Sequence, residues 1–553
     1  MTELFAKHEE MLKRALAAVA SREYWSPYPE SPRAYGDDAP SAGEHAFRDR
    51  LGKPLAIDQP ATGLSAGSEF SPYGTELGIT YPVTDIDELI GVAQAALSTW
   101  GRISVEERVG ACLEILARLQ DGVFEMGHAV MQTTGQPFLM AFQSGGPHAL
   151  ERGLEAVAHA YAEMTRLPDG PQRWEKPQGK RDPLRIDRQW YLRPRGIAVA
   201  IGVSTFPNLN GYPGIFASLA TGNPVIVKPH PSTILPLALF VATARSVLAE
   251  AGFDANTVQL AVDTLDEPIA QKLASHPAVG IIDCGGGSRL GRWLEENVPR
   301  ALVFTEKGRV NSVVIDSFGD LKGMLRNLSV SLTMFSGQMS TTPQNLYIPE
   351  AGIRVGEEQV SFDDIVAGLV DTISGLLADD QRAGDILGCI KSRNDVSNLI
   401  DNAVASGEVL LDSRKITHPS FPAAEVRTPV VVKVPVADRD VYMREMFGPI
   451  VFVVATAGTE ESLALARESA IRGGASSWLV YTGEEETKNS VISAAVDAGV
   501  SVAFNLTGGL YITQTAAFRD FQVTGAGPGG NASLTGPAFV SDRFGVVEVR
   551  ISV

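Results

Sequence analysis

Apolar positions recur at helical spacing in the first part of the chain. Residues 1–10 mix charged and apolar side chains and predict an amphipathic helix. Residues 25–80 are rich in proline, glycine, serine and acidic side chains, so we expect an irregular arm laid over the surface. Between residues 85 and 119 apolar side chains return every three or four positions. This spacing predicts helices that lead into the first domain.

Strand-like patterns replace the helical spacing after residue 184. Residues 184–192 alternate apolar with charged side chains, and residues 197–201 form a continuous apolar run typical of a buried strand. Further strands are expected at 224–227, 258–262, 279–283, 313–315, 430–432, 450–454 and 477–481, with helices at 236–251 and 267–276. Alternating strands and helices predict parallel sheets with crossover helices, an α/β fold that is doubly wound.

Composition and charge exclude several classes of protein. The formal net charge of −18 over 553 residues argues against a nucleic-acid or anionic-membrane surface, because both need clustered lysine and arginine. Prolines and asparagines interrupt the most apolar stretch, residues 196–227, so a membrane span is not expected. Cys112, Cys284 and Cys389 are isolated and support neither disulfides nor a metal site. We expect a soluble cytoplasmic protein.

Three polar landmarks follow one another in a distinctive order. Glu306 follows an apolar strand-like run, Ser340 lies in the segment 335–343 that reads Phe-Ser-Gly-Gln-Met-Ser-Thr-Thr-Pro, and Glu445 opens a Glu-Met-Phe-Gly-Pro segment. With the segment 217–229, this ordered set resembles the aldehyde dehydrogenase superfamily from about residue 80 onward. The 34-residue separation of Glu306 from Ser340 agrees with the spacing in that family.

Additional segments resemble one branch of the superfamily. Residues 208–213, 347–349, 411–414 and 505–509 are similar to the PaaN branch, which is associated with phenylacetate degradation. The resemblance implies an aldehyde dehydrogenase fold with a Rossmann-like cofactor domain, an α/β catalytic domain and a small oligomerisation sheet.

The resemblance also implies domain boundaries and an assembly. The expected parts are an N-terminal arm at 1–80, a dinucleotide-binding domain at 81–175 and 195–306, a catalytic domain at 307–525, and oligomerisation strands at 176–194 and 540–553. Strands of this kind leave an edge that must be paired or covered. A homodimer or homotetramer is expected.

Ser340 occupies the position at which the family carries its catalytic cysteine. A thiol is readily converted to a thiolate nucleophile, whereas a serine hydroxyl needs an adjacent base. In the family the glutamate at the Glu306 position activates water to release the acyl group. Ser340 is therefore a natural loss or redirection of the nucleophile, an engineered replacement, or an ordinary turn hydroxyl. Glu306 is alternatively a solvated acid paired with Lys307.

The oxyanion-binding position also departs from the family. Counted without gaps from Lys228, the asparagine of the family falls on Thr205, whose hydroxyl donates one hydrogen bond but reaches less far than an amide. Asn208 or Asn210 could compensate after a small backbone shift. Capping of a turn is the alternative role for both asparagines.

Cofactor-binding residues are expected at four places. Lys228 and Pro229 match the family residues that contact the adenine ribose, with Ser232 nearby. The acid that commonly follows three positions after the lysine is replaced by Pro231, which favours NADP over NAD because repulsion of a 2′-phosphate is lost.

Two further places are expected to contact the cofactor: a glycine turn and a pair of residues near position 445. Gly286 and Gly287 allow close backbone approach by a pyrophosphate. Glu445 and Phe447 resemble the residues that hold the nicotinamide ribose and ring. Cys284, beside the glycine turn, is expected to be a small buried residue.

We therefore expect an NAD(P)-dependent aldehyde dehydrogenase whose oxidative activity is reduced or redirected by Ser340. The substrate implied by the resemblance is a small aldehyde, with a CoA-linked semialdehyde of aromatic catabolism as one form. Two alternatives stay open: a non-redox or inactive subunit with the same fold, and acyl transfer through Ser340.

Overall fold

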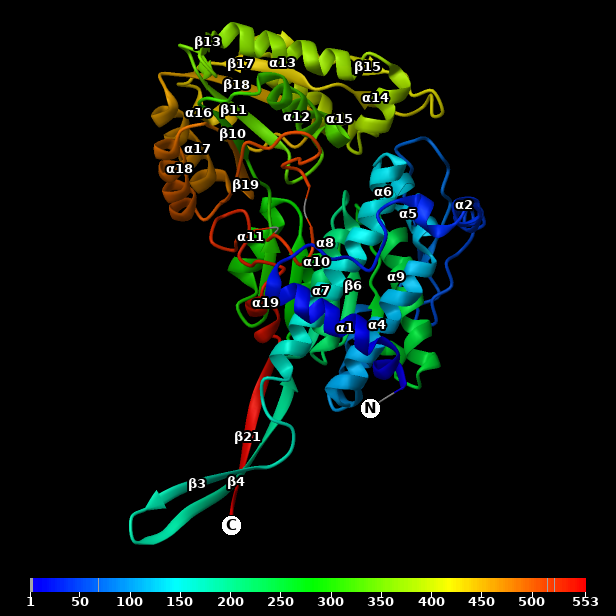
Figure 1. Cartoon of the computed structure of the whole chain (residues 1–553). Helices are drawn as coiled ribbons and strands as arrows, with labels where there is room; N and C mark the ends of the chain where they lie inside the picture. Colours follow the sequence, from blue (N-terminus) through cyan, green and yellow to red (C-terminus); the bar gives the residue numbers. More distant parts are fainter. Residues whose placement is uncertain (1–2, 68, 515, 522) are drawn as a thin grey trace.

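Two parallel sheets form the body of the molecule, and a third, antiparallel sheet projects from it (Figure 1). The computed structural model describes residues 3–67, 69–514, 516–521 and 523–553. Within these residues no helix is both long enough and apolar enough to cross a membrane.

The first sheet is parallel and has the strand order β7-β6-β5-β8-β9. Its strands are β5 (Ile197–Ile201), β6 (Val225–Lys228), β7 (Val258–Leu260), β8 (Val279–Gly285) and β9 (Leu302–Glu306). All five residues of β5 are buried because helices cover both faces of the sheet. This confirms the expected doubly wound α/β fold in the half of the chain that contains Lys228 and Glu306.

Helices from the N-terminal half cover this sheet. They are α1 (Glu3–Ser21), η1 (Pro32–Tyr35), α2 (Ala39–Arg48), α3 (Ile86–Trp100), α4 (Val105–Asp121), α5 (Val123–Thr134), α6 (Phe138–Gly145), α7 (Pro147–Met164), α8 (Pro207–Ala220), α9 (Leu235–Glu250), η2 (Ala255–Thr257), α10 (Ala270–Ala274) and α11 (Ser288–Asn297). The sequence sets where they begin. Ser104 and Glu107 form a capping box at α4, and Asp85 accepts hydrogen bonds from the first N–H groups of α3.

The second sheet has seven strands in the order β14-β17-β18-β11-β10-β19-β20, and only β14 runs antiparallel. Its strands are β10 (Asn311–Ile315), β11 (Pro343–Pro349), β14 (Glu408–Leu411), β17 (Val430–Val434), β18 (Ile450–Thr456), β19 (Ser477–Tyr481) and β20 (Ser501–Phe504). The helices of this half are α12 (Leu321–Thr333), η3 (Met334–Gly337), α13 (Phe362–Leu376), α14 (Asp380–Leu387), α15 (Arg393–Val404), α16 (Arg439–Tyr442), α17 (Thr459–Gly473), α18 (Glu485–Ala498) and α19 (Pro537–Ser541).

The antiparallel sheet has the order β21-β4-β3 and extends away from both domains as a long arm (Figure 1). Its strands are β3 (Gln172–Gln178), β4 (Arg181–Pro194) and β21 (Phe544–Ser552). Short two-stranded sheets complete the fold, formed by β1 (Ser65–Ala66) with β2 (Tyr81–Pro82), β12 (Ile353–Val355) with β13 (Glu358–Val360), and β15 (Lys415–Ile416) with β16 (Val426–Arg427). The sequence patterns did not predict β3.

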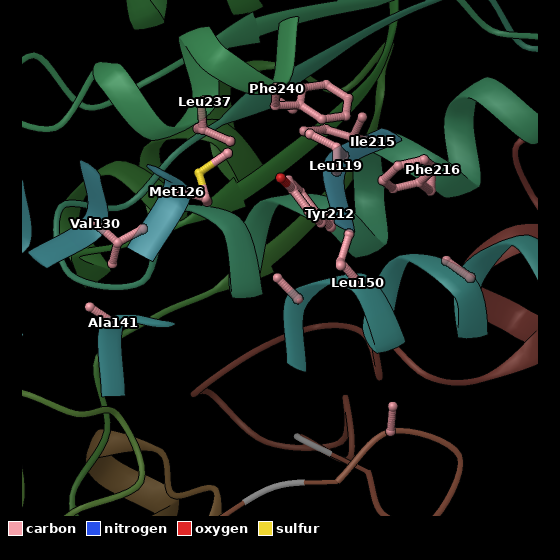
Figure 2. Packing of buried hydrophobic residues seen from close by; sticks show 14 of the residues in the cluster. Leu119, Met126, Val130, Ala141, Leu150, Tyr212, Ile215, Phe216, Leu237 and Phe240 are labelled. Atoms are coloured by element: carbon pink, nitrogen blue, oxygen red, sulfur yellow. The ribbon is translucent and has the colours of Figure 1, made fainter. Parts of the chain in front are cut away.

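The helical layer packs around α8, which lies directly after β5. Figure 2 shows Tyr212, Ile215 and Phe216 of α8 meeting side chains of neighbouring helices, among them Leu150 and Phe240. The Tyr212 ring lies 5.3 Å from the Phe240 ring and 5.6 Å from the Phe216 ring. Buried aromatic contacts of this kind fix the position of α8, and α8 begins where the expected oxyanion donors lie.

The N-terminal segment is more deeply built into the molecule than a surface arm. Residues 25–80 contain α2, and their side chains Tyr28, Leu55, Tyr73 and Leu77 are buried in the main core. Glu69 accepts hydrogen bonds from the backbone N–H groups of Ile234 and Leu235, at the start of α9. These buried anchors were not predicted, because they are scattered among prolines and glycines and lack any periodic pattern.

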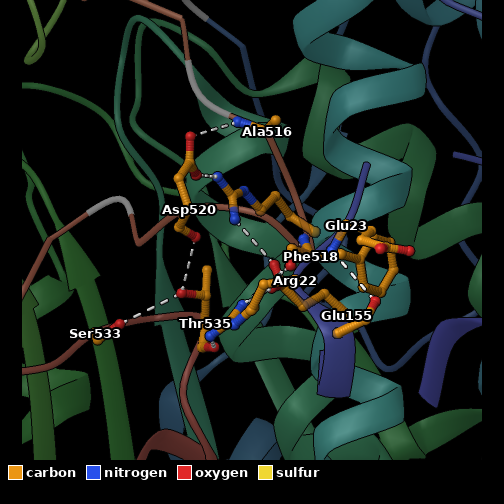
Figure 3. A network of polar contacts seen from close by, with 10 residues as sticks. Arg22, Glu23, Glu155, Ala516, Phe518, Asp520, Ser533 and Thr535 are labelled. Atoms are coloured by element: carbon orange, nitrogen blue, oxygen red, sulfur yellow. Dashed lines mark hydrogen bonds and ion pairs between the residues drawn. The ribbon is translucent and has the colours of Figure 1, made fainter. Parts of the chain in front are cut away.

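The end of α1 and the C-terminal segment share one polar network (Figure 3). Buried Arg152 contacts Glu155 at 2.9 Å and Asp520 at 2.8 Å. Glu155 also accepts a hydrogen bond from the Phe518 N–H and lies 3.3 Å from Arg22. Charges removed from water need partners on every side, so this network ties three segments that are distant in sequence.

A second buried ion pair joins the base of the arm to the first sheet. Arg543 is fully buried just before β21 and contacts both carboxylate oxygens of Asp283 on β8, at 2.6 and 2.8 Å. Its guanidinium also lies over the rings of Phe304 and Phe539. The pair therefore fixes the start of β21 beside the turn that follows β8.

Replacing Arg543 with glutamine should lower the free energy of unfolding by about 3 kcal/mol, because the Asp283 carboxylate would be left without its buried partner. Denaturant titration followed by circular dichroism measures the change. Arg550→Gln on the exposed part of β21 is the matched control and should leave the unfolding midpoint where it is. Equal midpoints for both variants would show that the buried pair does not contribute to stability.

Candidate active site

A cavity of about 510 Å³ lies between the carboxyl ends of the strands in the first sheet and the segment before β11. Its volume is in the range of small-molecule and cofactor sites. The predicted residues that line it are Thr205, Lys228, Gly286, Gly287, Glu306, Ser340, Glu445 and Phe447. Pro229, Ser232 and Asn208 lie outside this lining. Residues separated by more than 200 positions in the chain are thus brought to one cavity.

The turn that carries Ser340 has a strained backbone. Phe335 and Ser336 have φ values of 50° and 48°, and Gly337 follows at 67°. Left-handed conformations are costly for residues other than glycine and persist only where the surroundings enforce them. Phe335 is fully buried with its ring against that of Phe206, so the turn contacts the segment that carries Thr205.

Backbone hydrogen bonds hold this turn from three sides. The Gln338 side chain donates to the Cys389 carbonyl at 2.9 Å and accepts from the Lys391 N–H at 2.9 Å. Ser336 contacts two further carbonyls through its hydroxyl. Asn311, the first residue of β10, donates to the Ser340 carbonyl at 2.8 Å. Asn311 was not predicted as part of the site, although a polar residue at the start of an apolar strand is a signal of such a role.

The Ser340 hydroxyl forms no hydrogen bond with any part of the chain that the structure describes. No base is therefore hydrogen-bonded to this hydroxyl in the described part of the chain, although Glu306 lines the same cavity. The cysteines offer no substitute, since burial raises the pKa of the Cys112, Cys284 and Cys389 thiols to about 12 in each case. Cys284 is buried, as expected.

Glu306 ends β9 and is 6 % exposed. Its Oε2 accepts a hydrogen bond from Asn210 Nδ2 at 3.1 Å, and its Oε1 lies 3.6 Å from Nη2 of buried Arg309. Lys307, the alternative partner considered from the sequence, instead contacts Glu295 at 2.7 Å. The reading of Glu306 as a solvated acid paired with Lys307 was therefore wrong. The carboxylate is held in the cavity by an amide and a guanidinium.

The two candidate asparagines face different surroundings. Asn208 is fully buried and its amide donates to the Tyr212 hydroxyl at 2.8 Å, so the suggestion that it serves as an oxyanion donor in the cavity was wrong. The helical geometry of α8 explains the difference, because residues two positions apart point to different sides of a helix. Thr205 lines the cavity, and its carbonyl accepts a hydrogen bond from Gln136 at 2.6 Å.

At the other end of the cavity, Lys228 forms a buried ion pair. Its Nζ lies 2.7 Å from Oδ1 of Asp263, and the two side chains are 5 % and 0 % exposed. Asp263 follows β7, the strand that pairs with β6, which ends at Lys228. Pro231 stands three residues after Lys228, where the family resemblance implies an acid. The acid that contacts Lys228 follows the neighbouring strand, a relation that the local sequence does not reveal.

His230 lies in the same end of the cavity. Burial, together with the positive charges of Lys228 and Lys391, lowers the pKa of His230 to about 4. Its Nδ1 accepts a hydrogen bond from the Ser232 N–H. The hydroxyl of Ser232, which was expected to bind a cofactor, lies 2.9 Å from His230 Nδ1. This contact helps to fix the orientation of the histidine ring.

The turn after β8 leaves room for a ligand against its backbone. A Cβ added at Gly286 or Gly287 would meet no other atom within 4 Å, and Gly286 has a φ of 140°. Gly287 is the N-cap of α11 and has no side-chain cap. The first N–H groups of a helix lack intrahelical partners and attract anions.

Glu445 and Phe447 lie opposite this turn. The Glu445 carboxylate accepts a hydrogen bond from the Arg309 N–H at 3.0 Å, and burial raises its pKa. Gly308 leaves no space for a side chain, because an added Cβ would lie 1.9 Å from Glu445 Oε2. Gln344 of β11 accepts from the Met446 N–H, which fixes this segment to the second sheet.

These features define an α/β protein with a dinucleotide-sized cavity between its two sheets. The model of the aldehyde dehydrogenase family matches residues 79–516. The chain belongs to the aldehyde dehydrogenase family.

Solved structures and curated relatives agree with this assignment. The chain is similar to the crystal structure of an NAD-dependent aldehyde dehydrogenase from Burkholderia multivorans, with 48 % identity and a TM-score of 0.98 over 100 % of this chain and 99 % of that one. N-succinylglutamate 5-semialdehyde dehydrogenase of Chromobacterium violaceum is 26 % identical over 434 residues, 76 % of this chain and 81 % of the relative. The 1-pyrroline-5-carboxylate dehydrogenase of Thermus thermophilus shares the fold, with a TM-score of 0.74, 17 % identity, and coverage of 96 % and 99 %.

Gly337→Ala should disrupt the turn that carries Ser340. The added Cβ would lie 2.2 Å from the Gly448 carbonyl oxygen, and the φ of 67° disfavours any residue with a side chain. We expect a loss of about 2 kcal/mol in the free energy of unfolding, from strain and overpacking together. Urea titration measures it. Gly319→Ala is the control, since no atom lies within 4 Å of its added Cβ; a similar loss in both would contradict the packing argument.

Stability should also depend on pH through His230. In the unfolded chain this histidine takes up a proton near pH 6.5, whereas the folded site resists protonation down to about pH 4. The unfolded state therefore binds more protons in this window, and the stability present above pH 6.5 is lost as the pH falls. Unfolding of wild type and His230→Gln at pH 7 and pH 5 tests this. The variant should lose less stability between the two pH values, and parallel losses would count against it.

Proposed function

We propose that this protein binds NAD or NADP and an aldehyde in the cavity between its sheets, as an aldehyde dehydrogenase in which Ser340 stands in the place of the nucleophilic cysteine. The observation that carries the proposal is the convergence of Ser340, Glu306, Lys228 and Glu445 on one cavity. Their order along the chain agrees with the family resemblance, and their shared cavity supports the proposal.

The residues present fit a dinucleotide. The open backbone at Gly286 and Gly287, with the uncapped start of α11, suits the pyrophosphate. Lys228 would contact the adenine ribose, and Glu445 with Phe447 would hold the nicotinamide end. When bound, the nicotinamide supplies a hydride acceptor. The Burkholderia relative, which is NAD-dependent and 48 % identical, supports the use of NAD(P).

The remaining chemistry falls to the side chains around Ser340. Thr205 and backbone N–H groups would steady the aldehyde oxygen, in a site where buried donors act strongly. Asn210 and Arg309 hold Glu306 on the same cavity, as required of a base that takes a proton from water. Ser340 would present its hydroxyl to the carbonyl carbon. Because no base contacts that hydroxyl, we infer slow oxidation by the protein as it stands.

The lack of a base in contact with the Ser340 hydroxyl also favours a second candidate. This candidate is a subunit of the same fold that binds cofactor and aldehyde without turnover. The buried turn around Ser340 depends on Gln338, Ser336 and Asn311, none of which requires a thiol at position 340. Acyl transfer through Ser340 would need the missing base as well and has less support.

For the substrate we propose a small aldehyde, with a semialdehyde of aromatic catabolism, free or CoA-linked, as the form suggested by the resemblance to the PaaN branch. The curated relative named for N-succinylglutamate 5-semialdehyde offers a different semialdehyde for comparison. Both belong in a substrate panel.

We also propose that the protein forms a homodimer or homotetramer. The arm formed by β3, β4 and β21 exposes large apolar side chains, among them Tyr191, Val547 and Ile551. Exposed apolar strand faces of this kind are commonly covered by another chain.

The proposed function is tested by placing a thiol at position 340. Ser340→Cys should raise aldehyde-dependent NADH or NADPH formation by at least about 100-fold over wild type, since a thiolate attacks without help from a general base and gives a more reactive acyl group. Absorbance at the nicotinamide band, across a panel of aldehydes, measures the gain.

Two variants serve as controls. Ser340→Ala should stay at the background rate, and Ser340→Cys combined with Glu306→Gln should give a burst of reduced cofactor without sustained turnover, because acyl release needs the base. A folded Ser340→Cys protein that binds cofactor but gains no activity with any aldehyde would favour the non-redox candidate. If neither NAD nor NADP binds, both the dehydrogenase proposal and the non-redox candidate fail.

A further inference from the structure

The ion pair between Lys228 and Asp263 has a consequence for the choice of cofactor. Lys228 lines the cavity, whereas Asp263 lies behind it with a fully buried side chain. The Asp263 carboxylate is fixed on its other side, where Oδ2 accepts a hydrogen bond from the Ile269 N–H at 3.0 Å. The acid therefore cannot swing away from Lys228 without losing this contact.

We propose that Asp263 is a specificity-determining residue that makes the site prefer NAD over NADP. This inference rests on the proposed function, because it assumes that Lys228 meets the adenosine ribose. A 2′-phosphate carries up to two negative charges and needs an uncompensated cation beside it. Asp263 already neutralises the one lysine at this place and adds a negative charge behind it. A ribose with a free 2′-hydroxyl brings no charge and keeps the lysine as a hydrogen-bond donor.

Among the described residues, no other cation at this end of the cavity takes the place of Lys228 in binding a 2′-phosphate. His230 is neutral near pH 7, as shown by its lowered pKa. Lys391 is buried and directs its Nζ to the carbonyl oxygens of Thr133 and Ser232. Lys307 contacts Glu295, and Arg309 contacts Glu306.

Arg289 is the remaining cation of the lining and is exposed in the first turn of α11, at the place expected to receive the pyrophosphate. Both dinucleotides carry this pyrophosphate. Arg289 therefore attracts them equally and does not distinguish one from the other.

The inference reverses the preference drawn from Pro231. Replacement of the acid three positions after Lys228 removes one source of repulsion, but β7 places another carboxylate 2.7 Å from the lysine. The charge of Lys228 is therefore balanced by an acid that follows the neighbouring strand and not by a residue that follows Lys228 itself.

The experiment isolates the adenosine end of the cofactor. Binding of 5′-AMP and of adenosine 2′,5′-bisphosphate to the full-length protein is measured by titration calorimetry, and binding of NAD and NADP is measured alongside. The proteins are wild type, Asp263→Asn and Asp263→Ser. Asp266→Asn, at an exposed position in the same loop, is the matched control. Thermal melts show whether each variant is folded.

Wild type should bind the ligand without the 2′-phosphate at least about 10-fold more tightly, since like charges placed side by side are strongly unfavourable. Asp263→Asn or Asp263→Ser should reduce this ratio by about 10-fold, mainly through tighter binding of the 2′-phosphorylated ligand. Asp266→Asn should leave the ratio unchanged.

Equal or tighter binding of NADP by wild type would overturn the inference, and so would an unchanged ratio in a folded Asp263 variant. If the two substitutions prevent folding, tighter binding of the 2′-phosphorylated ligand by wild type still overturns the inference. If no adenine ligand binds at all, the proposed function fails instead. The readout does not involve Ser340, so a loss of catalysis cannot be mistaken for a loss of cofactor discrimination.

Discussion

The close approach of two backbone turns determines the geometry of the cavity. Gly337 lies so near the Gly448 carbonyl that no side chain fits between them. This contact places the segment that presents Ser340 against the segment that carries Glu445 and Phe447. The left-handed backbone at Phe335 and Ser336 is unfavourable, and it is offset by hydrogen bonds from side chains of the turn to three carbonyl groups in two other segments.

Three buried or half-buried cations in and near the cavity are each paired with an acid from a different element. Lys228 pairs with Asp263, Lys307 with Glu295, and Arg543 with Asp283. Removing a charge from water is costly unless it is paired in good geometry. Pairing across elements therefore stabilises the relative positions of strands and helices. It also leaves few uncompensated charges, so those that face the cavity dominate its preference for ligands.

Much of this could be predicted from the sequence, and what could not has a physical reason. Buried parallel strands such as β5 appear in the sequence as continuous apolar runs. Glu306 and Ser340 were proposed as site residues because their neighbours in sequence form motifs. Asp263 was missed because its partner Lys228 lies on a neighbouring strand, and Arg309 was missed although Glu306 lies only three residues before it. Asn208 was misplaced because the direction of a helical side chain depends on where the helix starts. The domain boundaries stay a prediction, although the arm begins at β3, before the expected residue 176.

The contacts that hold position 340 are made by its backbone and not by its side chain. Asn311 donates a hydrogen bond to its carbonyl oxygen, and the strained backbone precedes it. A hydroxyl and a thiol are similar in size. Under the proposed function, an exchange of one group for the other would therefore alter the activation of the nucleophile more than the folding. The cavity and its charge pattern are set by the turn, whichever of the two groups position 340 carries.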